Sequence, residues 1–457
     1  MAKKRGAKKR KITGSTSTHN VSINNNEPPE KVVKKEETPP TYPPSDGSEG
    51  DVICLGTPDQ EQPCPSLQNG FVGTECLEDW CRHNDIPLDY EHKLIGVSYC
   101  GTDAHVQFAT EIRKKWFQQC DEFDKDIWKH YKNNGQCSQV YDWKMQVRDK
   151  LFAEFKNVFY ATPKVNLWAV GSTVNGCGSY NSDMDLCLCL PDHSLANPYF
   201  TEKGKCLKVL RQVQAALKQR PALREIIKRT EVISQAKVPI IKVDLHPPYA
   251  ELDLDINVNN VAGVYNSHLI HYYSKVDVRF PSICLLVKHW AIINDISDAM
   301  NGTFNSYSLI LMVLHFLQCG VKPAVLPNLQ YLMPKLFSTE TELERLELHR
   351  DLEGMPERPL NKMKIGDLMM GFFAYYRNFD FQTWAISVRS GKKFLRSELE
   401  AGNSTYYIFI EEPFDLINTA RCVRDHHNFE TIRKAFRSTC QTLSKQAPQL
   451  KNIGVNL

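Results

Sequence analysis

The sequence lacks an apolar run long enough to cross a membrane. Its 457 residues are 42% hydrophobic and 24% charged, and no stretch approaches the ~20 apolar residues that a spanning helix needs. The charged N-terminus has no apolar segment after it, so we expect no secretory signal. These features predict a chain without membrane attachment, long enough for two or three domains with cores of their own.

Disulfide and zinc-finger spacings are also missing, although the chain holds 15 cysteines. Cys76 and Cys81 come closest to a metal pair, but no Cys or His pair completes them, so we expect no zinc site there. A large chain without a signal peptide is expected to keep its thiols reduced. Cys187 and Cys189 alternate along an expected strand, where they would be small buried apolar side chains.

Positive charge is scarce outside the first residues. The net charge is +3, yet residues 1–11 alone contribute +7, so the remainder carries −4. A body that holds nucleic acid tightly by itself usually has a general excess of positive charge. If this body acts on RNA, we therefore expect weak binding that depends on local patches or on a partner. The basic run itself fits a nuclear address, a nucleic-acid arm or a solubilising tail.

Apolar periodicity is nearly missing from residues 1–95, which we expect to be disordered because the segment cannot offset the entropy of ordering. Periodic patterns begin near residue 105. Their order predicts an α+β fold, in which a small α/β unit is inserted into a mostly helical body. The patterns predict helices at 106–131, 140–155, 204–219, 283–293, 307–317 and 365–379, and strands at 165–170, 185–190, 238–243 and 252–258.

The strongest motif spans residues 169–186 and reads AVGSTVNGCGSYNSDMDL. A strand ends at Gly171 and Ser172, and a second strand carries Asp183 and Asp185. Side chains two apart on a strand face the same side, so the two carboxylates are expected side by side. Glycine lets a backbone approach a ligand closely, and a Gly-Ser turn offers N–H groups and a hydroxyl to a phosphate.

A third carboxylate is expected from a neighbouring strand, where Glu251, Asp253 and Asp255 alternate with apolar residues. Close carboxylates raise each other's pKa unless a cation lies between them. Three of them on one face can hold two metal ions about 3.5–4 Å apart. A lone Asp-x-Asp is more often a solvated strand edge, but the Gly-Ser turn and the later acidic strand together favour a divalent metal site.

With these motifs the chain resembles the DNA polymerase β-like nucleotidyltransferases, and among them the cytoplasmic poly(A) RNA polymerases of the germline-development-defective type, which are related to terminal uridylyltransferases. The resemblance covers about residues 105–440. It implies helices at 100–155 that contribute to a helical domain, a mixed-sheet catalytic palm domain at 156–265 and a helical poly(A)-polymerase-associated domain at 266–445. The motifs that carry it are residues 171–188, 238–240, 255–260, 305–315, 366–376 and 411–421.

The resemblance selects Asp255 as the third carboxylate, because Asp255 precedes Ile-Asn-Val-Asn-Asn. It implies that Asp183, Asp185 and Asp255 are the catalytic ligands of Mg²⁺ or Mn²⁺. Asp255 would also act partly as a base towards the RNA 3′-hydroxyl.

Nucleotide contacts are likewise implied by the resemblance. Lys288 would neutralise the triphosphate, a role that suits a point charge, while Ile292 stands where some relatives have a second Lys, so the clamp is expected to be weaker. Without the resemblance, these side chains would fit a solvated helix face, a core aromatic or a cap. The implied contacts are Gly171, Ser172 and Ser306 at the phosphates, Lys288 at the triphosphate, Asn266 near the ribose and Tyr307 stacked on the base.

The implied reaction is the addition of adenosines from ATP to RNA 3′ ends. Uridylyl relatives carry a His in the loop after the Pro-Phe pair, and residues 415–420 contain none, which favours ATP over UTP. A terminal uridylyltransferase, a catalytically silent scaffold and a nucleotide-signalling enzyme are the alternatives. The three intact Asp residues argue against the scaffold, and the helical pattern after residue 282 argues against the signalling enzyme.

No RNA-binding module is visible in the sequence. Together with the charge distribution, this predicts recruitment by an RNA-binding adaptor protein. We expect a monomer that works in the cytoplasm, with a nuclear fraction if residues 1–11 act as a nuclear address. We expect structural or solvated roles for His268, His271, His426 and His427.

Overall fold

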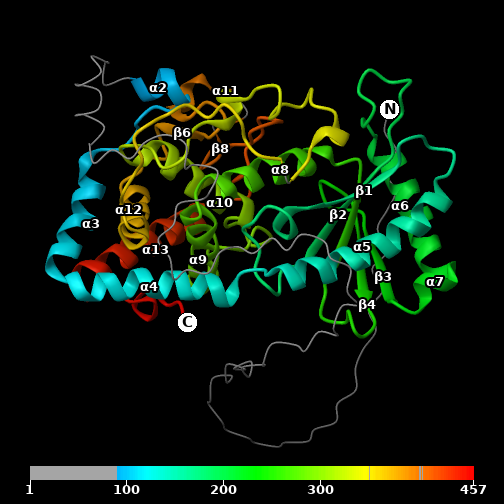
Figure 1. Ribbon diagram of the computed structural model, residues 1–457, viewed down its shortest axis with the longest axis horizontal. Coiled ribbons are helices and arrows are strands. Elements are labelled where there is room, and N and C mark those ends of the chain that lie inside the picture. The colour runs from blue at the N-terminus through cyan, green and yellow to red at the C-terminus, as the bar shows by residue number, and fades with distance from the viewer. Residues whose placement is uncertain (1–89, 349, 401–402, 404, 457) are drawn as a thin grey trace, which may run out of the picture. The chain divides into compact units, whose positions relative to one another are not determined.

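The computed structural model describes residues 90–348, 350–400, 403 and 405–456, which form a five-stranded sheet unit and a larger helical body (Figure 1). The disorder predicted for residues 1–95 falls mostly outside this part of the chain. The predicted end of the disordered segment, at residue 95, lies too far along the chain, because Tyr90–Ile95 form helix α2. Ile95 and Val97 are buried against Ala324, and this apolar contact orders the segment.

The large sheet has the strand order β1-β2-β5-β4-β3 and is mixed, as predicted. Only β2 and β5 run parallel; the other neighbours are antiparallel. The four predicted strands are present, but β3 was not predicted because it is a charged edge strand without apolar alternation. The strands are β1 (Asn166–Val170), β2 (Met184–Cys189), β3 (Ile227–Ile233), β4 (Ile240–Leu245) and β5 (Leu254–Val258).

Alternation along the strands divides the sheet into two unlike faces. Leu186 and Leu188 of β2 pack with Leu254 and Ile256 of β5 under the helices α5 (Ser138–Val158) and α6 (Lys203–Gln219). Cys187 belongs to a second cluster, on the face covered by α8 (Val261–Val276), and is buried as predicted. The residues that alternate with these buried side chains point to the α8 side of the sheet, and Asp185 and Asp255 are among them.

Helix α5 corrects one domain assignment. The resemblance implied that all helices in 100–155 contribute to the helical domain. Val147, Leu151 and Phe155 of α5 instead belong to the core of the sheet. Only α3 (Asp103–Lys115) and α4 (Phe117–Asn134) join the helical core, in which Phe123 and Ile127 are buried.

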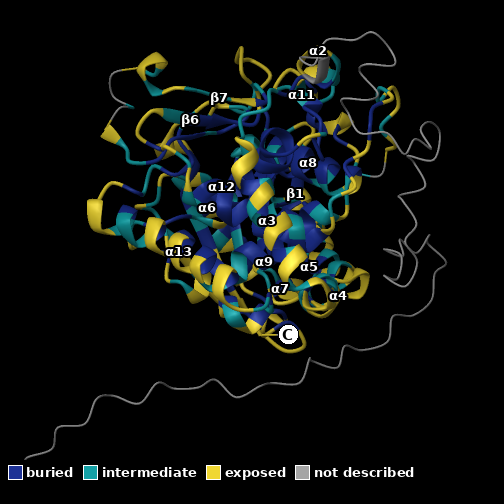
Figure 2. Ribbon diagram, turned by 90° about the vertical axis from the view of Figure 1, so that its left-hand side faces the viewer, coloured by how far each residue is buried: buried dark blue, intermediate teal, exposed yellow. Residues whose placement is uncertain are grey.

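The helical body surrounds a large apolar core, and Figure 2 shows buried residues concentrated on α9 and α12 while α3 and α13 expose their outer faces. Trp290 of α9 lies at its centre, between Phe373 of α12 and Phe436 of α13, with ring centroids 4.8 and 4.9 Å away. Its remaining helices are α9 (Arg279–Ile293), α10 (Ser306–His315), α11 (Leu329–Leu332), α12 (Ile365–Arg377) and α13 (His426–Lys445).

Several local predictions differ from the structure. The helix predicted at 106–131 breaks at Trp116, where φ is −131° and ψ is 56°, because α3 packs on α12 whereas α4 packs on α9 as well as on α12. The helix predicted at 307–317 ends at His315 and continues as a π-helical turn at Phe316–Gly320. Helix α8 and the small sheet β7-β6-β8 were not predicted; these strands are Trp384–Ser387 (β6), Lys392–Leu395 (β7) and Ile410–Glu411 (β8).

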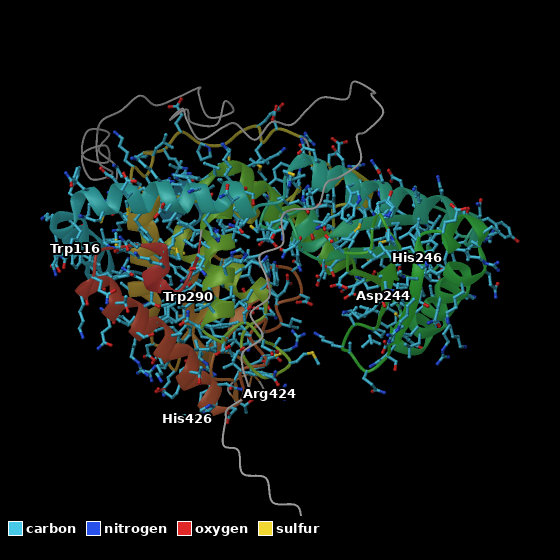
Figure 3. All side chains as sticks on the ribbon, turned by 90° about the horizontal axis from the view of Figure 1, so that it is seen from below. Trp116, Asp244, His246, Trp290, Arg424 and His426 are labelled. Carbon is cyan, nitrogen blue, oxygen red and sulfur yellow. The ribbon has the colours of Figure 1, made fainter. Side chains whose placement is uncertain are left out.

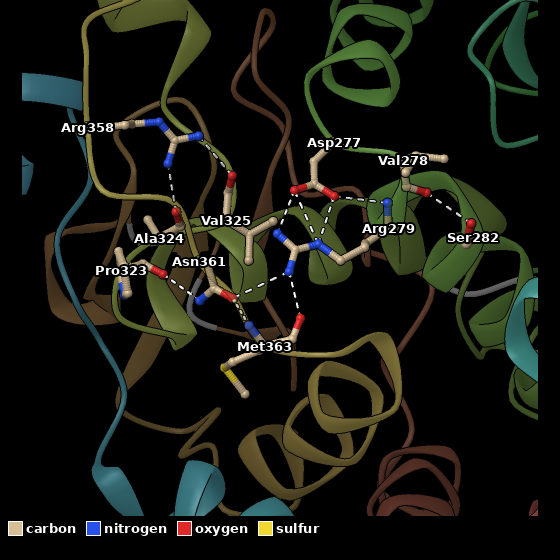
Figure 4. Close-up of polar contacts among 10 residues, drawn as sticks. All are labelled: Asp277, Val278, Arg279, Ser282, Pro323, Ala324, Val325, Arg358, Asn361 and Met363. Atoms are coloured by element: carbon tan, nitrogen blue, oxygen red, sulfur yellow. Dashed lines mark hydrogen bonds and ion pairs between the residues drawn. The ribbon is translucent and has the colours of Figure 1, made fainter. Parts of the chain in front are cut away.

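A polar network fastens the segment before α12 to the helical core (Figure 4). Asp277 accepts hydrogen bonds from Arg279, whose guanidinium also donates to the carbonyl of Met363 at 2.7 Å. Asn361 donates to the Pro323 carbonyl at 2.7 Å, and Arg358 donates to two further carbonyls of the same loop. The long connection to α12 is thus held by side-chain contacts with backbone groups.

Among the described residues, no helix combines the length and apolar character that a bilayer-spanning segment requires.

Trp290→Ala should lower the free energy of unfolding by about 3–5 kcal/mol, because it opens a cavity among three helices and removes the partner of the Thr439 hydroxyl, 3.0 Å from the indole nitrogen. Urea denaturation monitors this change. Ile292→Ala, two residues along the same helix and 59% exposed, should cost about 0.5 kcal/mol or less. Equal losses in both variants would contradict the assignment of Trp290 to the centre of the core.

Candidate active site

The register of the sheet brings the three predicted carboxylates together. Asp185 of β2 lies opposite Asp255 of β5 in a parallel pair, and it also lies opposite Val170 at the end of β1. Asp183 immediately precedes β2, and its carboxylate lies close enough to act on the charge of Asp185. The chain therefore gathers these side chains at one end of the sheet, beside the Gly171–Ser172 turn.

The turn after β1 is shaped by a glycine that no other residue can replace without strain. Gly171 has φ of +67°, and a Cβ atom built there would lie 2.8 Å from Asp185 Oδ2. Its N–H donates to Ser267 Oγ at 2.7 Å, and Ser267 donates in turn to the Gly263 carbonyl at 2.6 Å. Helix α8 thus holds the turn against the carboxylates.

Burial, with a contribution from neighbouring carboxylates, disfavours the ionised forms of Asp185 and Asp255. Burial, together with the carboxylates of Asp255 and Asp183, raises the pKa of Asp185 to about 6. Burial also raises the pKa of Asp255, with Asp183 and Asp253 adding to the shift and Lys242 opposing it. Asp255 Oδ1 is buried and has no hydrogen-bond partner among the described residues. Hard oxygen ligands that repel each other, one of them unpartnered, fit a divalent cation.

Lys144 of α5 is a neighbour of this cluster that the sequence analysis did not identify. Its ammonium is fully buried and donates to Ser182 O at 2.7 Å, Ser182 Oγ at 3.0 Å and Gln136 Oε1 at 3.0 Å. Burial lowers the pKa of Lys144 to about 8, while Asp183 and Asp185 oppose the shift. Lys144 therefore positions the segment that enters β2.

The signal for Lys144 was present in the sequence. It interrupts the apolar stripe of α5 between Val140 and Val147, at the helical spacing of a core position. A lysine at such a position needs buried acceptors, and the Asp-x-Asp strand lies beside it.

Lys288 of α9 reaches the same region. Its ammonium donates to the carbonyl of Cys177, in the loop between β1 and β2, at 3.2 Å. Burial lowers its pKa, and the nearby Asp183 carboxylate opposes this shift. Ile292, one helical turn further on, is exposed to solvent, so the described part of α9 offers one cation to this loop.

Of the other candidate nucleotide contacts, Ser172 and Asn266 adjoin residues that shape this cluster. Ser172 belongs to the turn itself, and Asn266 precedes the Ser267 that holds Gly171; its Oδ1 is buried without a partner in the described structure. Ser306 is exposed at the start of α10. No hydrogen bond within the described residues joins Ser306 or Tyr307 to the carboxylates.

Tyr307 is positioned by Glu412. The Tyr307 hydroxyl donates to Glu412 Oε1 at 3.2 Å, and Glu412 Oε2 accepts from the N–H groups of Phe414 and Asp415 at 2.7 and 2.6 Å. Burial raises the pKa of Glu412 to about 7. The loop after the Pro-Phe pair is thereby tied to the aromatic ring expected to stack on a base.

The histidines contact the backbone or other aromatic rings. His271 bonds the carbonyls of Val174 and Leu348 at 2.8 and 2.7 Å, and His268 is buried beside Tyr272. These contacts agree with the structural roles expected for both.

Comparison with known proteins identifies the family. Bovine "Poly(A) RNA polymerase GLD2" is 33% identical over 398 residues, which are 85% of this chain and 77% of the relative. The chain belongs to the GLD2 poly(A) RNA polymerase family. The mouse GLD2 enzyme is 38% identical over 62% of this chain and 57% of its own length, and C. elegans gld-2 is 31% identical over 72% of this chain. The chain spans 33% of that C. elegans protein.

Family models and solved structures agree with the GLD2 assignment. Residues 123–275 match the central palm domain of mitochondrial-like poly(A) RNA polymerase, and residues 364–418 match the Cid1 family poly A polymerase. The GLD-2 chain in the GLD-2/RNP-8 complex superposes with a TM-score of 0.64 and 32% identity, covering 74% of this chain and 98% of that one. The Cid1 poly(U) polymerase with MgGTP superposes with a TM-score of 0.59 and 26% identity, covering 72% and 97%. Nucleotidyltransferases of this kind typically depend on divalent metal ions.

Gly171→Ala should weaken Mn²⁺ binding by roughly tenfold or more, because the added methyl meets Asp185 Oδ2 and the backbone is left-handed. Electron paramagnetic resonance of free Mn²⁺ measures the affinity. Gly204→Ala is the matched control, since nothing lies within 4 Å of a Cβ built there. Unchanged Mn²⁺ affinity in Gly171→Ala would show that the turn does not support the carboxylates.

Asp185→Asn should stabilise the metal-free protein at pH 7.5 by up to about 3 kcal/mol. The folded pKa of Asp185, about 6, lies above its ordinary value of 3.8, so ionisation costs stability as pH rises through this window. The gain should shrink to roughly 0.5 kcal/mol near pH 4, where the carboxyl is protonated in the folded state and only about half ionised in the unfolded state. Urea denaturation with a chelator at the two pH values measures it. Asp244→Asn, an exposed change on β4 (labelled with Trp290 in Figure 3), is the control substitution. A loss of stability in Asp185→Asn at pH 7.5 would show that the folded protein does not disfavour the ionised carboxylate.

Proposed function

We propose that this protein is a polynucleotide adenylyltransferase, which adds adenosines from ATP to RNA 3′ ends without a template and releases diphosphate. The observation that carries the proposal is the convergence of Asp183, Asp185 and Asp255 beside the Gly171 turn, with the pKa of Asp185 raised to about 6 by burial and by its neighbours. The names of the GLD2 relatives support the same activity.

The chain's own residues account for binding and orientation in this reaction. Ser172 presents its hydroxyl to the triphosphate beside Gly171, whose own N–H is bound by Ser267, and Lys288 supplies positive charge from α9. Asp255, whose Oδ1 has no hydrogen-bond partner among the described residues, would accept the proton of the RNA 3′-hydroxyl. Asp183, Asp185 and Asp255 would hold Mg²⁺ or Mn²⁺, and the bound ion would supply positive charge to the phosphates.

The loop after Phe414 favours ATP over UTP. Asn418, the one amide in residues 415–420, is buried and its side chain bonds the backbone at Ile408, Ile410 and Ala420. No histidine in this segment is available to read a uracil. One solved Cid1 structure is of a histidine-to-asparagine variant with MgATP bound. A terminal uridylyltransferase remains the second candidate, because stacking by Tyr307 accepts any base.

We further propose that an RNA-binding adaptor recruits the protein to RNA. GLD-2 has been solved in complexes with RNP-8 and with GLD-3. The net charge of −4 outside residues 1–11 supports weak RNA binding by the body itself. Action as a monomer in the cytoplasm, with residues 1–11 as a route to the nucleus, belongs to the same proposal.

Incorporation of each of the four nucleotides on a defined RNA primer, with Mg²⁺ or Mn²⁺, tests the function. ATP should be used at least about tenfold better than UTP, and Asp185→Ala should lose at least about 10³-fold in rate, because the carboxylate constellation acts as a unit. Asp244→Ala, an exposed carboxylate on the neighbouring strand, should retain activity. Preference for UTP would establish the second candidate, and equal activity of Asp185→Ala would refute the catalytic assignment.

A further inference from the structure

Three side chains with soft ligand atoms meet at the far end of helix α10. The thiols of Cys100 and Cys319 and a ring nitrogen of His315 lie within 4.8 Å of one another. His315 and Cys319 are fully buried, whereas Cys100 is half-buried. Ser306 begins α10 and His315 ends it. At 1.5 Å per residue the cluster therefore lies roughly 15 Å along the helix from the candidate nucleotide contacts.

The backbone around the cluster is organised to hold these residues together. α10 changes at His315 into the π-helical turn Phe316–Gly320, which places Cys319. Turns of this kind frequently mark functional sites. The Cys100 N–H donates to the Cys319 carbonyl at 2.7 Å, and the Lys393 N–H of β7 donates to Cys100 Sγ at 3.3 Å. An N–H directed at sulfur stabilises a thiolate, which is the form that binds metal.

The imidazole of His315 has one nitrogen without a partner. Nε2 lies 3.0 Å from the Tyr375 hydroxyl, while Nδ1 is buried with no hydrogen-bond partner in the described structure. If Nε2–H donates to Tyr375, Nδ1 carries a lone pair in a dry environment, which is costly when nothing receives it. A ring whose second nitrogen is fixed by a hydrogen bond is the usual state of a histidine that ligates a metal.

We propose that Cys100, His315 and Cys319 form a zinc site, with Nδ1 as the histidine ligand. Two thiolates and an imidazole are soft and borderline ligands that suit Zn²⁺. Binding releases the two thiol protons to solvent, and the two thiolates balance the charge of the ion, so no net charge is buried. The fourth tetrahedral position falls to a water molecule on the half-exposed side of Cys100.

The proposed ion would cross-link two segments of the helical body and lie beside a third. Cys100 precedes α3, His315 and Cys319 span the α10–π junction, and Lys393 connects the site to the small sheet. Its role is structural and separate from the carboxylate cluster, so its test does not depend on nucleotide transfer.

Cobalt titration of the full chain in the presence of a non-thiol reductant tests the proposal. Thiolate coordination gives Co²⁺ an intense charge-transfer absorption, whereas oxygen ligands such as the three carboxylates do not. Wild-type protein should gain one equivalent of thiolate-bound Co²⁺ that Zn²⁺ displaces. Cys100→Ser and Cys319→Ser should each lose this equivalent, and Cys422→Ser, which alters another half-buried cysteine, should retain it.

Melting temperature supplies a second readout that also checks folding. Zn²⁺ should raise the melting temperature of wild type and of Cys422→Ser by more than that of Cys100→Ser, which keeps the carboxylate cluster as a cation site but lacks the thiolate site. If Cys319→Ser fails to melt cooperatively, the half-exposed Cys100→Ser carries the comparison. Identical Co²⁺ spectra of wild type and Cys100→Ser would overturn the proposal, as would a Cys100–Cys319 disulfide that persists under reductant.

Discussion

Parallel pairing of β2 with β5 forces like charges into one small volume. The alternate residues of these strands, including Leu186 and Ile256, are buried beneath α5 and α6. A slip of one residue would turn those leucine and isoleucine side chains towards the opposite face, so the apolar core fixes the register. The same register places Asp185 opposite Asp255. Hydrophobic burial on one face of the sheet thus stabilises an arrangement of charges on the other that would otherwise separate.

Two helices hold the flanks of this charged face. Ser267 of α8 accepts the N–H of Gly171, and Lys144 of α5 donates to Ser182. One helix fixes the turn before the acidic strand and the other fixes its entry. Because both contacts use side chains on long, packed helices, the segment between β1 and β2 is held at its two ends by rigid elements.

Much of the fold could be predicted because its signals are local. Strand alternation and the Gly-Ser/Asp-x-Asp motif give the sheet and its carboxylates, and the four predicted strands are present. The break at Trp116 and the placement of α5 could not be predicted in this way, since they depend on which distant surface each helix packs against. The edge strand β3 was not predicted, because its charged residues interrupt the alternation of apolar and polar residues that indicates a strand.

The residues of the candidate site likewise differ in whether a local sequence signal identifies them. Asp183 and Asp185 follow from strand periodicity, which left Glu251, Asp253 and Asp255 open as the third carboxylate. The choice of Asp255, like those of Lys288 and Tyr307, required a family resemblance, because a lysine or tyrosine on a helix has many ordinary roles. Lys144 and the pair of His315 with Cys319 become visible only when residues far apart in sequence are brought into contact. The spacing of residues along the sequence does not indicate which distant residues are in contact.

The parallel pairing also constrains the order in which the molecule is made. β2 ends at Cys189 and β5 begins at Leu254, so α6, α7 (Pro221–Arg224), β3 and β4 all intervene. Contacts that close such long loops form slowly. A growing chain would therefore carry Asp183 and Asp185 without Asp255 for as long as this crossover is being synthesised, and the acidic cluster can assemble only after the crossover has emerged and folded.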